Sequence, residues 1–71
     1  MKNYRIIIGS PIEYDYVTAE IVVDDLYVVL MQKEEGEDKM ILEFYENGMA
    51  KKIYVDDFIK ALNEAREMLK K

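Results

Sequence analysis

The stretch that decides the fold is TAEIVVDDLYVVLMQK, residues 18–33. Residues 18–24 carry small or aliphatic side chains at alternate positions, which predicts a strand with one buried face. Asp24 and Asp25 indicate a tight turn, because short polar side chains tolerate the backbone angles that such turns require. Residues 26–33 are almost wholly apolar and predict the next strand. The stretch therefore predicts an antiparallel hairpin inside a sheet.

Strand patterns continue on both sides of this hairpin. The sequence Gly9-Ser10-Pro11 ends an N-terminal apolar run, because proline cannot donate a hydrogen bond to a sheet. On the other side, Glu34-Glu35-Gly36-Glu37-Asp38 indicates a solvated loop with glycine at its bend, and Asn47-Gly48 is a strong hairpin signal. We therefore expect three further strands, at about residues 4–9, 39–45 and 50–55.

The last part of the chain predicts a helix at about residues 57–70. Asp56 is a favourable N-cap, and Asp57 adds negative charge to the first turn, where the helix dipole favours it. Apolar residues recur at helical spacing and form one stripe: Phe58, Ile59, Leu62, Ala65, Met68 and Leu69. We therefore predict one α+β domain, 1–71, in which an antiparallel meander of four to five strands carries one C-terminal helix on one face.

The composition excludes much familiar chemistry. The 71 residues contain no cysteine and no histidine, so Ser-His-Asp and Cys-His catalytic arrangements cannot be built. The commonest zinc, copper and iron sites lose their ligands as well. The longest apolar run, residues 26–31, is far too short to span a membrane. We expect a cytoplasmic protein that is not an enzyme and binds no metal or cofactor.

The net charge of −5 is unevenly distributed. Residues 13–38 hold nine acids against one base, Lys33, and this sign disfavours direct binding of nucleic acid. Solvated turns explain most of these acids, but a surface that mimics nucleic acid before a basic protein is an alternative. The candidate acidic surface comprises Glu13, Asp15, Asp24, Asp25, Glu34, Glu35, Glu37 and Asp38.

One helix cannot cover both faces of the predicted sheet. A helix of this length extends about 21 Å and is about 10 Å wide, whereas five strands span about 24 Å. We expect the helix to cover Ile6, Ile8, Ile21, Val23, Val29, Met40 or Leu42, Phe44, Ile53 and Val55. The opposite face would then present an apolar surface, which is typical of an interface. Its candidate residues are Ile7, Val22, Val28, Leu30, Ile41, Tyr45 and Tyr54.

These patterns favour a small acidic protein-binding module that acts by occupying a surface. A homodimer is the simplest form, and inhibitors and immunity or counter-defence proteins are analogous small acidic domains. A sheet curled strongly enough to bury both faces is the alternative to an exposed interface. A small-ligand-binding domain, with a pocket between helix and curled sheet or at a dimer seam, is the alternative function.

The order of motifs resembles a widespread family of short bacterial proteins with no known activity. The residues that carry the resemblance are Gly9, Pro11, Tyr14, Ala19-Glu20-Ile21, Asp24 or Asp25, Val28 to Gln32, and Asp56 to Leu69. They extend over nearly the whole chain. The resemblance implies a compact domain with a sheet and a C-terminal helix, and it implies no activity or functional residues.

Overall fold

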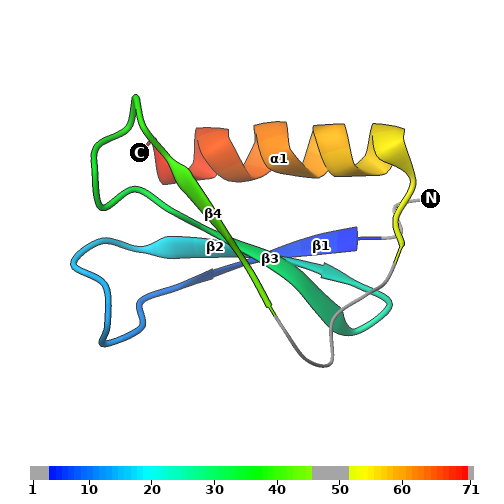
Figure 1. Ribbon diagram of the computed structural model, residues 1–71, viewed down its shortest axis with the longest axis horizontal. Coiled ribbons are helices and arrows are strands. Elements are labelled where there is room, and N and C mark those ends of the chain that lie inside the picture. The colour runs from blue at the N-terminus through cyan, green and yellow to red at the C-terminus, as the bar shows by residue number, and fades with distance from the viewer. Residues whose placement is uncertain (1–3, 46–51, 71) are drawn as a thin grey trace.

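A four-stranded antiparallel sheet carries one helix on one face (Figure 1). The computed structural model describes residues 4–45 and 52–70. The strands follow one another in chain order, and their bounds are β1 Tyr4–Gly9, β2 Thr18–Val23, β3 Leu26–Gln32 and β4 Ile41–Phe44. Helix α1 extends over Val55–Leu69. The predicted α+β fold, with an antiparallel meander and one C-terminal helix, is confirmed.

A fifth strand was predicted at residues 50–55, and the described part of this range does not form a strand. Residues 50 and 51 lie outside the described residues, whereas 52–54 form no strand and Val55 is already helical. The helix therefore begins two residues before the predicted start. Tyr54 holds the N-cap position with extended backbone angles, so the predicted cap at Asp56 is wrong. Asp56 lies instead in the first turn, where its negative charge still complements the helix dipole.

The turn between β2 and β3 follows the prediction. Both Asp24 and Asp25 have positive φ, at 51° and 65°, and this pair of left-handed conformations is the signature of a type I′ hairpin turn. Aspartate tolerates this region better than branched or bulky residues do. The two acids are therefore explained by the turn that they form.

A bulge in β3 changes the side on which Val28 is buried. Ile21 pairs with Val29 and Val22 pairs with Tyr27, so Val28 is an additional residue without an opposite partner. Strict alternation would place Val28 on the face away from the helix. The bulge instead lets both Val28 and Val29 join the core beneath α1. The prediction that Val28 belongs to the opposite face is therefore wrong.

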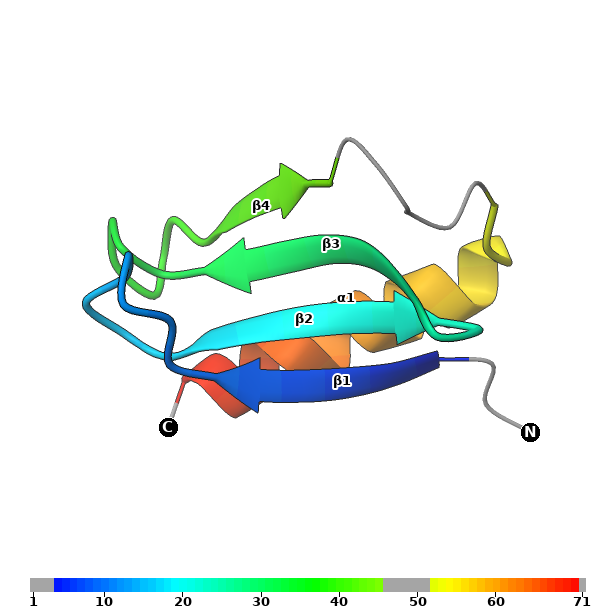
Figure 2. The same cartoon turned by 90° about the horizontal axis from the view of Figure 1, so that it is seen from below.

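Small residues bring the helix close to the centre of the sheet. Ala61 and Ala65 are fully buried, and they pack against residues of β2 and β3 in two continuous clusters. The helix contacts β1, β2 and β3, and in Figure 2 most of it lies behind β1 and β2. Three side chains predicted to lie under the helix are exposed, namely Ile8, Phe44 and Val55.

A matched pair of isoleucine substitutions tests this description of the core. Ile21 is fully buried and Ile12 is fully exposed. We expect Ile21→Ala to lower the free energy of unfolding by about 2–5 kcal/mol, because it leaves a cavity beneath the helix. Ile12→Ala should change it by less than about 0.5 kcal/mol. Urea denaturation followed by circular dichroism measures both, and equal effects would contradict the assignment of the core.

Candidate protein-binding groove

The face of the sheet away from the helix is closed in large part by its own tyrosines. The Tyr45 hydroxyl donates a hydrogen bond to Glu20 of β2, so its side chain crosses over β3. The Tyr27 ring lies 5.6 Å from the Tyr45 ring, centroid to centroid. Beneath this layer, Val22 is 2% exposed and Leu30 is 8% exposed. The chain itself therefore shields these two aliphatic side chains from water.

The loop between β1 and β2 is held to the same side of the sheet. The Tyr14 hydroxyl donates to Glu43 Oε1 at 3.0 Å, and the Gln32 amide donates to the other oxygen of that carboxylate at 2.9 Å. The Glu34 carboxylate accepts hydrogen bonds from the backbone N–H groups of Asp15 and Tyr16, at 3.0 and 3.1 Å. These hydrogen bonds hold the loop to β4 and to the beginning of the β3–β4 connection within one copy of the chain.

The predicted interface residues do not form one exposed apolar surface. Val22 and Leu30 are buried within one copy of the chain, and Val28 faces the helix. Tyr54 lies at the helix N-terminus and not in a strand. The remaining three, Ile7, Ile41 and Tyr45, are half-buried. The expectation of an uncovered second face is therefore wrong. Tyrosine side chains of the same chain cover it, with their rings over the aliphatic residues and their hydroxyl groups on glutamates.

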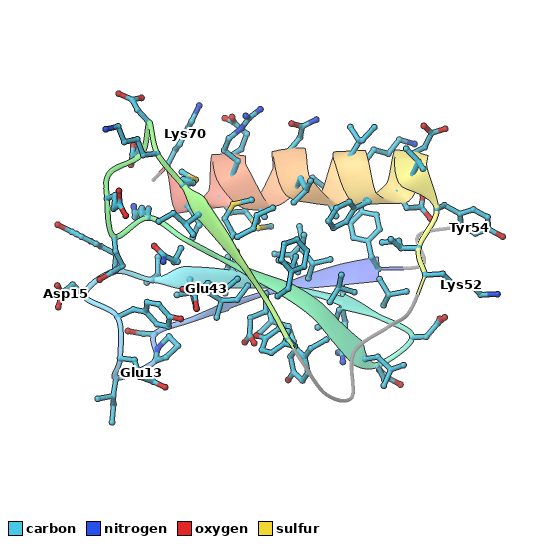
Figure 3. The ribbon with its side chains drawn as sticks, in the orientation of Figure 1. Glu13, Asp15, Glu43, Lys52, Tyr54 and Lys70 are labelled. Carbon is cyan, nitrogen blue, oxygen red and sulfur yellow. The ribbon has the colours of Figure 1, made fainter. Side chains whose placement is uncertain are left out.

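The candidate acidic residues lie at both ends of the sheet. Asp24 and Asp25 occupy the β2–β3 turn, whereas the other six lie in the β1–β2 and β3–β4 connections at the opposite end (Figure 2). Glu13 and Asp15 are labelled at that opposite end in Figure 3. Asp25 forms an exposed ion pair with Arg5 at 3.2 Å. Mimicry of nucleic acid needs carboxylates along one surface, whereas two of the eight lie at the end of the sheet opposite the other six.

A hollow lies on the helix side, between α1 and β4. Its volume is about 540 Å³, and its apolar lining comes from Met31, Met40, Leu42, Ile59 and Leu62. Glu37 and Asp38 lie on the hairpin side of this hollow, while Asn63, Arg66 and Lys70 lie on the helix side. Lys70 is visible beside the β3–β4 loop in Figure 3. We call this hollow, with those ten residues, the α1–β4 groove.

Two large apolar side chains on the helix side of the molecule are exposed, and one of them, Ile59, lines the groove. Phe44 is 63% exposed and Ile59 is 51% exposed. Cross-strand pairing with Val29 places Phe44 on the helix side of the sheet, but the helix does not extend over it. The helix lies over the first three strands, so that Leu42 of β4 still packs against the core whereas Phe44 does not.

The outer edge of β4 borders the same groove. Within residues 4–45 and 52–70, β4 pairs with β3 alone. Its other edge presents backbone N–H and C=O groups to whatever lies beside it. Exposed apolar side chains and an edge strand therefore come together at one place. The sequence analysis named a pocket between the helix and the sheet only as an alternative and assigned no residues to it, because the sequence does not reveal the position of the helix across the sheet.

Hydrogen bonds to glutamates raise the pKa of several tyrosines. The Tyr4 hydroxyl donates to Glu64 of the helix at 2.6 Å, and this bond is the main reason that its pKa rises to about 12. Burial is the first cause of the raised pKa of Tyr45, followed by its hydrogen bond with Glu20. Deprotonation of either phenol would put a second negative charge beside a carboxylate.

The Tyr4 pair predicts a loss of stability at high pH. Its folded pKa of about 12 lies above the unfolded value of 10.0, so the contribution is complete below pH 10 and is lost as pH rises towards 12. We expect the free energy of unfolding of Tyr4→Phe to fall less than that of the wild type between pH 9 and pH 12. Urea titrations at both pH values measure this, and parallel decreases would contradict it.

Comparison with known proteins does not assign a role to this groove. No family model matches the chain, and no curated protein or solved structure is similar to it. The resemblance to short bacterial proteins therefore stays a prediction. In the described part of the chain, no cluster of three or more acids is placed to hold a metal ion. Nor is α1, the helix of that part, long and apolar enough to cross a membrane.

Proposed function

We propose that this chain is a small acidic protein-binding module without enzymatic activity. It binds an extended segment of a protein, which adds as a strand to the outer edge of β4 and places apolar side chains in the α1–β4 groove. One observation carries the proposal: within residues 4–45 and 52–70, β4 pairs with β3 alone, and Leu42 of this strand lines an apolar groove. Strand addition of this kind combines backbone hydrogen bonds with pockets for alternate side chains.

The composition of β4 supports strand addition. Edge strands that avoid partners usually carry lysine, proline or an inward-pointing charge. The four residues of β4 are Ile-Leu-Glu-Phe, and the carboxylate of Glu43 is already engaged by Tyr14 and Gln32. Nothing in the strand itself therefore opposes a new neighbour.

The absence of histidine and cysteine supports a binding role over catalysis. An inhibitor or an immunity or counter-defence protein that occupies a surface needs only a stable fold and a docking edge. The cysteine-free composition is also compatible with a cytoplasmic location, which we keep as part of the proposal.

Site-specific photo-cross-linking in the native host tests the proposed function. A photoreactive phenylalanine analogue replaces Ile59, in the groove, or Ile8, which is 45% exposed in the opposite edge strand β1. We expect a defined adduct from position 59 and none from position 8, with the joined peptides sequenced by mass spectrometry. The partner segment should alternate apolar and polar residues, as a strand does.

A substitution in β4 provides the control for that experiment. Phe44→Lys puts a charge on the helix-side face of the edge strand and should reduce the position-59 adduct at least about tenfold, equivalent to about 1.4 kcal/mol. Phe44→Leu keeps an apolar side chain and should retain most of it. Equal adducts at positions 59 and 8, or an adduct insensitive to Phe44→Lys, would count against the proposal.

The volume of the groove favours a second candidate, a small anionic ligand. About 540 Å³ falls within the roughly 300–1,000 Å³ of small-molecule sites, and Arg66 and Lys70 line one side. This candidate predicts saturable binding of the anionic apolar dye anilinonaphthalene sulfonate to the folded protein. Arg66→Glu should weaken it about fivefold, whereas Lys60→Glu, outside the groove, should not. Equal effects of the two substitutions, by fluorescence titration, would reject it.

A further inference from the structure

We propose that the segment bound at β4 is the β4 strand of a second copy of this chain, paired about a two-fold axis that passes through Leu42. This inference rests on the proposed function and identifies its partner. It follows from the few registers that β4 allows with itself, from the charge in the strand, and from the exposure of Phe44 on the helix side of the sheet.

The alternation of β4 limits the possible registers. Leu42 and Phe44 lie on the helix side, because they pair with Met31 and Val29, while Ile41 and Glu43 lie on the other side. Residues opposite each other in an antiparallel pair share one face. A two-fold axis perpendicular to the sheet must therefore place one residue opposite its own copy. Axes through Leu42 or Glu43 keep the strands overlapped, whereas axes through Ile41 or Phe44 pair only the strand ends.

Charge selects between the two remaining registers. An axis through Glu43 would set two like carboxylates directly opposite each other, which is destabilising. An axis through Leu42 sets Leu42 opposite Leu42 of the second copy, and Glu43 opposite Ile41. Glu43 can then keep its hydrogen bonds to Tyr14 and Gln32, on the side of the sheet away from the helix.

The same register brings the exposed phenylalanine to the groove. With Leu42 on the axis, Phe44 of one copy stands opposite Met40 of the other, on the helix side. Met40 is part of the groove lining, so the projecting ring of each copy meets the hollow of its partner. A two-fold interface uses one patch on both subunits, and that patch must be complementary to itself. The surface around β4 meets this requirement, because it contains both a projection and a hollow.

The register can be determined from disulfide formation between single introduced cysteines, since the chain has no cysteine of its own. Each register places one residue opposite itself, within about 4.5–5.5 Å between Cβ atoms. We expect Leu42→Cys to form a disulfide-linked dimer under mild oxidation at least about ten times faster than Glu43→Cys, Phe44→Cys or the distant Ile8→Cys. Circular dichroism verifies that each variant keeps the wild-type fold. Sedimentation of the wild type at about 100 µM should show a dimer, which requires a Kd below this concentration.

Each other result overturns a defined part of the inference. Fastest cross-linking of Glu43→Cys or Phe44→Cys would replace the axis through Leu42 by another register. A monomeric wild type, together with equal slow oxidation of all four variants, would exclude the second copy. The proposed function is decided separately, by the adduct from position 59 in the host, which would then contain a different protein.

Discussion

The close contact between two alanines and the middle of the sheet determines the architecture. Ala61 and Ala65 are fully buried, and side chains this small let the helix backbone approach the sheet closely. Larger residues beside them, such as Leu69, fill the space on either side within the same clusters. A helix seated this way lies over β1 to β3. That position leaves Phe44 exposed and the α1–β4 groove open, while Leu42 of β4 still packs against the core.

The two faces of the sheet are covered by different chemistry. On the helix side, aliphatic packing dominates and ends before the last strand. On the other side, tyrosine rings lie over aliphatic residues while their hydroxyls reach carboxylates, as in the Tyr45–Glu20 and Tyr14–Glu43 pairs. Tyrosine suits this task because one side chain supplies both apolar area and a hydrogen-bond donor. The acidic residues in the strands therefore anchor tyrosines over the aliphatic residues of that face.

Local patterns in the sequence predicted most of the elements, but not their lateral arrangement. The alternation in 18–24, the Asp24-Asp25 turn and the helical stripe around Leu62 depend on near neighbours, so a single sequence reveals them. The bulge at Val28 depends on how β2 and β3 pair. The alternation of apolar residues in the sequence does not reveal this pairing. The reach of Tyr45 across β3 and the position of the helix across the sheet depend on packing between distant segments. These long-range features decided which surface stayed open.

The order of the strands also has a consequence for how the chain folds. Each strand pairs with its neighbour in sequence, so three hairpins form with short loop closures and little loss of chain entropy. Only the helix must return to the start of the chain, and the Tyr4–Glu64 hydrogen bond spans 60 positions. Closure of this longest loop is expected to follow the pairing of the central hairpin, with the alanines of α1 docking onto a sheet that already exists.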